Sequence, residues 1–333
     1  MHENLGYFIQ CVRYFIQCVK CNYIFNIYCI QFNVKNSQKR WLVMQKNVTT
    51  FDYAQLRRSV YGFKEKYPFV GCCVCARSWS GRAVFSLSLG SAQSPALFVA
   101  GIRGGDTVSV RVMLKFFERL CEAVETDNDL AGIRIGEVLK EKGIIIIPCL
   151  NPDGMEISLK GAVAAGSYAG LVERVCSDTS SWRANARGID LNLNFSSDFI
   201  GSKKAAENCG YTAPGPYFHA GKVPESEPET RALVRLCGTK SVRHTLTLEN
   251  GGSYVYSPRC DEGMERIEMM SRILELSSGI SRLKESPSPL EKHGFADWFV
   301  KKHKRPSFVL NADGSECEVY AVLEEMLVLS IVM

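Results

Sequence analysis

Polar clusters that could bind a ligand follow an apolar run in the middle of this sequence. The run at residues 143–150 is rich in isoleucine and ends at Asn151-Pro152-Asp153-Gly154. This pattern is typical of a buried strand that enters a turn, because proline fixes φ and glycine accepts a positive φ. Two further clusters, W-R-A-N at residues 182–185 and G-I-D-L-N-L-N-F at 188–195, follow and include Arg183. Ligands of α/β proteins usually bind where strands end, so residues 151–195 are the first candidate site.

The cysteines do not form a recognisable site. The chain has 14 of them, and most stand in apolar surroundings along the whole sequence. Neither the C-x-x-C of residues 18–21 nor the group at residues 72, 73 and 75 has a second pair at the spacing of a zinc site. Because no secretory signal precedes them, we expect reduced thiols in a cytoplasmic protein.

Composition and charge indicate a globular protein. The 333 residues are 46% hydrophobic and 23% charged, and a net charge of +5 comes from basic and acidic residues that are intermixed. This mild charge gives no support for nucleic-acid binding. The longest uncharged stretch near the N-terminus, residues 21–34, is too short and too polar to span a bilayer. We therefore expect neither a nucleic-acid nor a membrane partner.

Residues 1–43 differ from the rest of the chain. The sequence Y-F-I-Q-C-V occurs at residues 7–12 and again at 14–19, and acidic residues are almost absent. We predict that residues 1–43 are an N-terminal extension outside the fold, or precede a true start at Met44. An interfacial amphipathic segment is the alternative. The folded domain is predicted to comprise residues 44–333.

From residue 44 onward, strand-like runs alternate with helical periodicity. A hairpin is predicted at residues 70–89, and further strands at 96–101, 144–147, 244–248 and 307–310. Helices are predicted at residues 53–66, 107–125, 226–237, 263–278, 294–302 and 317–332, the third with Ser226 as N-cap and Glu229 completing a capping box. This alternation predicts a single-domain α/β/α sandwich, in which helices cover a mixed, mostly parallel, twisted sheet.

Eight short segments together carry a family resemblance across roughly residues 50 to 330. They are G-I-R-G-G-D at 101–106, N-P-D-G at 151–154, W-R-A-N at 182–185, G-I-D-L-N-L-N-F at 188–195, S-E-P-E-T at 226–230, E-N-G-G-S-Y-V-Y at 249–256, G-F-A-D-W-F at 294–299 and F-V-L-N at 308–311. In this order and spacing the chain resembles the zinc metallocarboxypeptidases of the carboxypeptidase A type. It is most similar to small bacterial members that trim peptides or cell-wall peptides.

The resemblance implies a specific chemistry. Two zinc ligands come from an H-x-x-E motif and a third from a later histidine, and an open position holds water. The metal lowers the pKa of that water and polarises the scissile carbonyl, while a glutamate near the last strand takes the proton. An arginine stabilises the oxyanion, and an Asn-Arg pair holds the terminal carboxylate of the substrate.

The metal and base positions of the family are substituted in this sequence. The three ligand positions correspond to Arg103, Asp106 and Glu249, and the general-base position to Asn311. A guanidinium stays protonated and has no lone pair for zinc, and an amide is no useful base at neutral pH. None of the five histidines has a glutamate three residues later, so no displaced motif replaces the site. Zinc is the family cofactor, but we expect no cofactor in this chain.

The substrate-binding positions are partly retained. Arg183 stands at the oxyanion position, and Asn192 at the first position of the carboxylate-binding pair, whose second position is Leu193. Arg103, Asp106 and Glu249 should converge, and a guanidinium can bridge two carboxylates. We predict that they form an ion cluster in place of zinc; the alternative is three independent, solvated side chains.

Three functional hypotheses follow. The loss of two histidine ligands and the general base in one site predicts an inactive pseudo-peptidase that binds a peptide or cell-wall peptide, with Arg183 contacting an anionic end. The alternative is an active metallopeptidase with a non-standard metal site, in which Asp106, Glu249 and an unidentified donor hold a hard cation. The third is a purely structural or interaction role.

Overall fold

The computed structural model describes residues 51–259, 264–286 and 294–333. The predicted N-terminal extension, residues 1–43, lies outside the described residues. Within the described part of the chain, the helices are too short or too polar to span a membrane.

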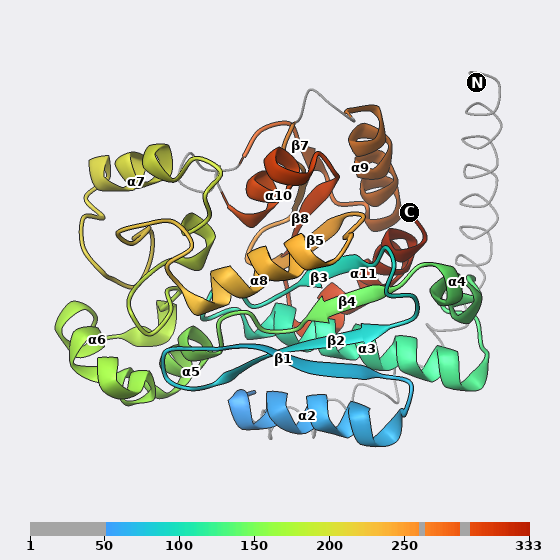
Figure 1. Ribbon diagram of the computed structural model, residues 1–333, viewed down its shortest axis with the longest axis horizontal. Coiled ribbons are helices and arrows are strands. Elements are labelled where there is room, and N and C mark those ends of the chain that lie inside the picture. Colours follow the sequence, from blue (N-terminus) through green and yellow to red (C-terminus); the bar gives the residue numbers. More distant parts are fainter. Residues whose placement is uncertain (1–50, 260–263, 287–293) are drawn as a thin grey trace, which may run out of the picture. The chain divides into compact units, whose positions relative to one another are not determined.

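A single mixed sheet of eight strands organises the described residues (Figure 1). The strand order is β1-β2-β4-β3-β5-β8-β6-β7. The central strands β4, β3, β5 and β8 pair in parallel, whereas β1–β2, β2–β4 and β6–β8 are antiparallel. The strands are β1 Gly71–Arg77, β2 Ala83–Leu89, β3 Ala96–Val99, β4 Ile144–Ile147, β5 Thr245–Asn250, β6 Tyr254–Tyr256, β7 Arg282–Leu283 and β8 Ser307–Ala312.

Helices cover both faces of this sheet. On one face α2, α3, α9 and α11 pack over a core that includes Phe98 and Leu246. On the other face α8 and α10 pack over Leu97 and Val99. Because successive strand residues point to opposite faces, both faces of the central strands must be apolar, which explains their uninterrupted hydrophobic runs. The predicted α/β/α sandwich is confirmed.

The helices have the following bounds in the described residues. They are α2 Tyr53–Lys66, α3 Thr107–Thr126, α4 Ile135–Glu141, α5 Pro152–Lys160, α6 Ala169–Val175, α7 Phe199–Asn208, α8 Pro228–Thr239, α9 Met264–Ser278, α10 Phe295–His303 and α11 Glu316–Val332, with 3₁₀ helices η2 Ala162–Tyr168, η3 Thr179–Ser181 and η4 Leu191–Leu193.

Two local predictions are wrong. The N-P-D-G segment is a helix start: Asn151 is the N-cap of α5, and its Oδ1 accepts the backbone N–H of Gly154 at 2.8 Å. Asparagine and proline favour turns, but they favour the first positions of a helix equally. The capping box at residues 226–229 does not form either, because α8 begins at Pro228 with Glu227 as N-cap and Glu229 is buried.

The parallel strands deliver the candidate residues to one edge of the sheet. Arg103 lies just after β3 and Asn151 just after β4, while Glu249 and Asn311 lie near the carboxyl ends of β5 and β8. Since these four strands run in the same direction, their carboxyl ends meet.

Candidate functional site

Three neighbouring strands form the floor of a pocket. In the strand register, Glu249 of β5 lies beside Asn311 of β8, which lies beside Tyr254 of β6. Two residues earlier along β5 and β8, Thr247 lies beside Val309, which in turn lies beside Tyr256 of β6. Because side chains alternate between faces, all six point to the same side of the sheet. The floor is therefore two rows of three residues.

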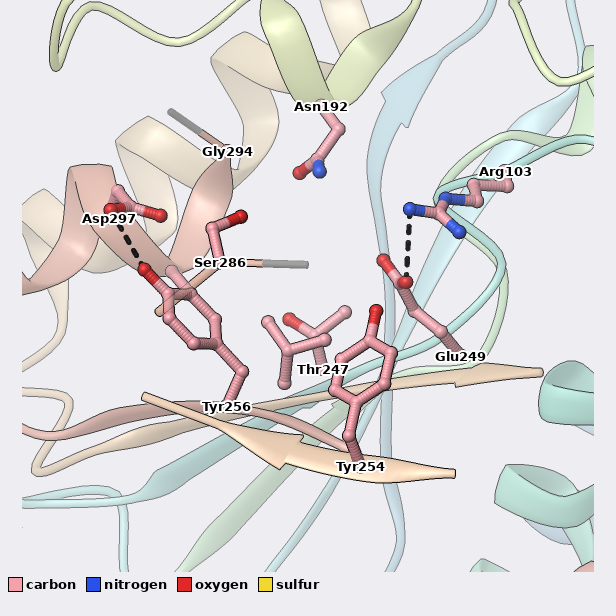
Figure 2. Close-up of a pocket in the computed structure, with 11 residues that line it drawn as sticks. Arg103, Asn192, Thr247, Glu249, Tyr254, Tyr256, Ser286, Gly294 and Asp297 are labelled. Carbon is pink, nitrogen blue, oxygen red and sulfur yellow. Dashed lines mark hydrogen bonds and ion pairs between the residues drawn. The ribbon is translucent and has the colours of Figure 1, made fainter. Parts of the chain in front are cut away.

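Other elements supply the walls of this pocket (Figure 2). Arg103 comes from the loop after β3 and Asn192 from η4. Ala296 and Asp297 come from the first turn of α10. The pocket is small, with a cavity volume of about 20 Å³, and opens to solvent.

Arg103, in the wall of this pocket, forms an ion pair with Glu249 of its floor. Arg103 Nη2 lies 3.2 Å from Glu249 Oε2, and the two side chains are 15% and 5% exposed. An ion pair this sheltered from water is screened less than a surface pair. It joins the first and third of the three predicted ligand positions.

Asp106 is not part of this ion pair. It is the N-cap of α3: Oδ1 accepts the backbone N–H of Ser109 at 3.0 Å, and Oδ2 accepts that of Asn250, also at 3.0 Å. Burial raises the pKa of Asp106, while these hydrogen bonds lower it. The predicted three-membered cluster is thus wrong for Asp106, because the start of α3 and the end of β5 use its carboxylate. No described residue forms a salt bridge with it.

The described residues at this place do not fit a zinc ion. Arg103 has no lone pair to offer, Glu249 faces that guanidinium, and both oxygens of Asp106 accept backbone N–H groups. In residues 51–259, 264–286 and 294–333, no three histidine, cysteine, aspartate or glutamate side chains are grouped as a metal site. His244 is buried at the opposite end of β5, where burial lowers its pKa to about 3.

Asn311, which is predicted to stand at the general-base position, is buried between Glu249 and Tyr254. Its Nδ2 donates to the Tyr254 hydroxyl at 3.1 Å. Its Oδ1 accepts no hydrogen bond from any described residue, and the same holds for the hydroxyl of Thr247 in the neighbouring row. The floor therefore carries two unsatisfied polar atoms.

The substrate-binding positions divide between the pocket and its surroundings. Asn192 lines the pocket, and its Oδ1 accepts the backbone N–H of Phe295 at 3.1 Å. A Cβ at Gly294 would collide with the Asn192 amide, so this close approach requires glycine. Leu193 lies instead in an apolar cluster with Phe199, which is not part of the pocket lining.

Arg183 lies against a strained loop. Its guanidinium carbon is 5.2 Å from the centre of the Phe218 ring, a cation–π distance. Phe218 has a φ of 62°, which is unfavourable for a bulky residue. Its backbone N–H donates to Asp190 Oδ2 at 3.1 Å, and the other Asp190 oxygen accepts the backbone N–H of Asn192 at 3.1 Å. Asp190 thus connects the Arg183–Phe218 contact to a pocket wall.

Several pocket residues were not predicted from sequence, among them Thr247, Tyr254, Tyr256 and Asp297. The Tyr256 hydroxyl lies 3.5 Å from Asp297 Oδ1, and burial, followed by this carboxylate, raises the pKa of Tyr256. Thr247 could have been found from strand alternation, because it stands two residues before Glu249 and must share its face. The positions of Tyr254 and Tyr256 could not be predicted in this way, because they depend on the pairing of β6 with β8.

A second polar network, the scaffold network, holds the loops between α5 and α8. We define it as Asn151, Asp153, Asn185, Asn194 and Glu227, which are all fully buried. Asn151 Nδ2 is within 3.2 Å of three loop carbonyl groups. Asn194 Nδ2 contacts three oxygens at 2.9–3.2 Å, and its Oδ1 accepts the backbone N–H of Glu227. These residues replace the regular backbone pairing that the loops lack.

The two carboxylates of the scaffold network attach the β1–β2 hairpin. Asp153 accepts hydrogen bonds from Ser78 Oγ at 2.7 Å and Arg82 Nη1 at 2.6 Å. Glu227 Oε2 accepts Trp79 Nε1 and Asn185 Nδ2, each at 2.7 Å. The hairpin turn is thereby connected to both α5 and the start of α8.

Comparison with known proteins identifies the same family as the motifs. A family model described as zinc carboxypeptidase matches residues 57–288. The protein YqgT of Bacillus subtilis (strain 168) is 24% identical over 276 residues, which cover 81% of this chain and 71% of that protein. Gamma-D-glutamyl-L-diamino acid endopeptidase 1 of Lysinibacillus sphaericus is 22% identical over 264 residues, which cover 78% of this chain but only 65% of that protein.

The fold also matches a solved structure. Thrombin activatable fibrinolysis inhibitor superposes with a TM-score of 0.67 at 17% identity, covering 85% of this chain and 74% of that one. At this identity the match supports the fold alone.

Proposed function

Because the chain belongs to the zinc carboxypeptidase family, we propose that it is a member that binds peptides in its pocket without hydrolysing them. Zinc is the cofactor of this family, and the proposal concerns what the substituted site of this chain can still do. The proposed folded domain is residues 44–333. The free thiols of the described cysteines favour a reducing compartment such as the cytoplasm.

The Arg103–Glu249 ion pair carries the proposal of inactivity. A guanidinium 3.2 Å from Glu249 brings a fixed positive charge to the place where the family would bind a cation. Zinc could bind there only if the guanidinium moved away, and Glu249 would then lose this contact with Arg103. Asn311 adds a second obstacle, since its amide cannot take a proton from water at neutral pH.

Peptide binding is supported by the parts of the pocket that remain. Asn192 still lines it, and the floor offers hydroxyl, amide and carboxylate groups beside tyrosine rings. Sites of this kind combine an apolar surface with a few polar groups that fix orientation. By its name, the Lysinibacillus relative cleaves a bond between γ-D-glutamate and a diamino acid, so cell-wall peptides are proposed ligands alongside ordinary peptides.

Contact between Arg183 and an anionic ligand group stays a prediction. Arg183 is not among the described residues that line the pocket, and its guanidinium rests on Phe218. An Arg183→Ala protein should lose affinity for peptides with a free terminal carboxylate, but keep its affinity for the same peptides with an amidated end. Equal affinity of parent and variant for the carboxylate form would remove this role.

Metal analysis and hydrolysis assays on the full chain test inactivity. We expect less than about one-tenth zinc per chain after dialysis, against the full occupancy of a structural or catalytic zinc site. We also expect no cleavage of C-terminal or γ-D-glutamyl-diamino acid peptides. Turnover that chelators abolish, and that Asp106→Asn and Glu249→Gln each remove, would establish the alternative of an active enzyme with a non-standard metal site. Binding of the same peptides, measured by calorimetry, tests the other half of the proposal.

A further inference from the structure

Basic residues gather at the edge of the sheet that lies opposite the pocket. The pocket is at the carboxyl ends of β5 and β8, whereas α8 and α10 end just before these two strands begin. Thr245 pairs with Ser307, so β5 and β8 start at the same edge. Since β5 has 6 residues, about 17–20 Å separate this edge from the pocket. We define the basic patch as Lys240, Lys301, Lys302, Lys304 and Arg305.

Hydrogen bonds of one arginine join the two parts of the basic patch. Arg305 follows α10, and its Nη1 donates to Ser241 Oγ at 3.2 Å and to the carbonyl oxygen of Val242 at 2.7 Å. Lys240, the C-cap of α8, precedes Ser241, and Lys304, the C-cap of α10, precedes Arg305. The four lysines of the patch are exposed, and Arg305 is partly buried. Charges from two distant segments of the chain therefore lie side by side.

No acidic residue of these two segments offsets the charge of the patch. Residues 230–248 and 298–312 contain neither aspartate nor glutamate. Within the described part of the chain, no residue of the patch forms an ion pair with a carboxylate. The five basic residues equal the net charge of +5 of the whole chain, so all other residues are together neutral. The patch thus accounts for the net positive charge of the protein.

The ends of the two helices explain only part of this charge. Lys301 and Lys302 lie in the last turn of α10, where cations offset the partial negative charge of a helix end. Each helix end carries about half an elementary charge, so α8 and α10 together offset about one of the five positive charges. Burial, followed by the charges of Arg305 and Lys302, lowers the pKa of His303. The patch therefore keeps an excess of positive charge that a bound anion would neutralise.

The side chains around the patch restrict the kind of anion. The exposed large hydrophobic side chains of the described residues lie outside residues 230–248 and 298–312, so these segments offer none that would enter a bilayer. Trp298 and Phe299 are buried, so their rings are not available for base stacking. Four of the five cations are lysines, whose ammonium groups act as point charges and suit single carboxylates.

The extent of the patch suits a short anionic segment. Neighbouring strands are about 4.8 Å apart and a helical turn rises about 5.4 Å, so the patch spans about 10–15 Å. An extended chain advances about 3.3 Å per residue, so about three to five consecutive residues cross this distance. Exposed ion pairs are individually weak and are screened by salt, so binding would be transient and salt-dependent.

We propose that the basic patch binds a short acidic segment of a partner protein, with aspartate or glutamate carboxylates opposite its lysines. This inference goes beyond the proposed function, because the patch and the pocket lie at opposite edges of the sheet. It needs no ligand in the pocket, and its outcome is independent of whether peptides bind there.

Fluorescence anisotropy with two labelled peptides tests the proposal on the full chain. The probes are Gly-Glu-Glu-Glu-Glu-Gly and its glutamine counterpart, which has nearly the same shape without the charges. In about 20 mM salt the glutamate peptide should bind about tenfold more tightly, and in about 500 mM salt this advantage should fall below about threefold. Equal affinity of the two peptides at low salt overturns the proposal.

Two matched double variants locate the interaction. Lys301→Gln/Lys302→Gln removes two charges from the patch, and Lys204→Gln/Lys222→Gln removes two charges from exposed lysines elsewhere. Both change the net charge equally, and both should leave the melting temperature nearly unchanged because the four sites are exposed. Only the first should weaken binding of the glutamate peptide, by about twofold to thirtyfold. An equal loss in both variants, or no loss in the first, contradicts the proposal.

Other polyanions and a second copy of the chain are outcomes of the same experiment. The glutamate peptide should bind more tightly than an oligothymidylate with an equal number of negative charges. Tighter binding of the oligonucleotide would assign the patch to nucleic acid. Binding to vesicles with about 30% phosphatidylserine, if Lys301→Gln/Lys302→Gln abolishes it, would assign the patch to an anionic membrane. Self-association of the parent at low salt that the same variant abolishes would assign it to a second copy. Each of these three results overturns the proposal.

Discussion

The scaffold network and the pocket floor are both polar and buried, but they differ in how completely their atoms are paired. In the scaffold network, Asn151 and Asn194 use both ends of their amides, and Glu227 accepts hydrogen bonds on both oxygens. On the floor, Thr247 and Asn311 keep polar atoms that no described residue satisfies. Among the described residues, the amides and the Glu227 carboxylate of the first region are paired at both ends, whereas two polar atoms of the second region are not.

This difference explains how a substituted site can coexist with an intact fold. The scaffold residues hold loops that lack regular backbone pairing, so the fold depends on them directly. Arg103 and Asn311, by contrast, stand where the family resemblance implies groups that serve a metal and a proton transfer. Replacing such groups leaves intact the contacts on which the loops depend. The four predictions below test this separation.

The largest effect is expected from rebuilding the metal site. An Arg103→His/Glu249→His protein would offer two imidazoles beside the Asp106 carboxylate, which already approaches the backbone of Asn250 at 3.0 Å. It should bind one zinc ion with a micromolar or lower dissociation constant, which corresponds to a binding free energy of about 8 kcal/mol or more. Calorimetry after dialysis measures this affinity. Arg103→His alone is the control and should bind far more weakly. Failure of the double variant would mean that the three positions do not converge closely enough for a metal.

Removing a scaffold carboxylate should cost the most stability. Glu227→Ala leaves Trp79 Nε1 and Asn185 Nδ2 without their acceptor, and should lower the free energy of unfolding by about 3–5 kcal/mol in urea titrations. Glu207→Ala is the matched control: this glutamate is exposed and lies 4.0 Å from Lys203. It should change stability by less than about 0.5 kcal/mol. A loss below about 1 kcal/mol in Glu227→Ala would show that the network is dispensable.

Sequence reasoning found the sheet and the site edge because both depend on local patterns. The short apolar runs at β3, β4, β5 and β8 are typical of buried strands. The motifs placed Arg103, Glu249 and Asn311 at the ends of these strands. Predictions from sequence were wrong where a side chain's partners come from distant parts of the chain. Asp106 was expected to join an ion pair, but its carboxylate caps α3 and accepts the N–H of Asn250 from a strand far along the chain. Glu229 was predicted to complete a capping box with Ser226, yet tertiary packing buries it.

The burial of Glu229 predicts a pH-dependent stability. Burial raises its pKa from the ordinary 4.5 to about 8, so between these values the folded protein holds a proton that the unfolded chain has lost. Stability should therefore fall as the pH rises from about 4.5 to 8 and level off above that range. Glu229→Gln should abolish this slope and exceed the parent by about 4 kcal/mol at pH 8, with little difference near pH 4.5.

Urea titrations at several pH values measure this effect, with Glu207→Gln as the exposed control that should leave the slope unchanged. A parent whose stability rises with pH over the same window would show that Glu229 is ionised in the folded protein. The first turn of α8 would then carry a buried charge close to Asp153 and Glu227 of the scaffold network.

The smallest effect is expected at the ion pair between the wall and the floor of the pocket. Arg103→Met should lower stability by about 2 kcal/mol, because Glu249 is only 5% exposed and loses a cation at 3.2 Å. Adding Glu249→Leu should recover most of that loss, since a sheltered ion pair can be replaced by apolar groups at little net cost. Lys140→Met/Glu137→Leu, at an exposed pair, should stay within about 0.5 kcal/mol of the parent. If Arg103→Met alone has no effect, Arg103 and Glu249 are independent, solvated side chains. The pocket would then lack the fixed charge on which its proposed inactivity depends.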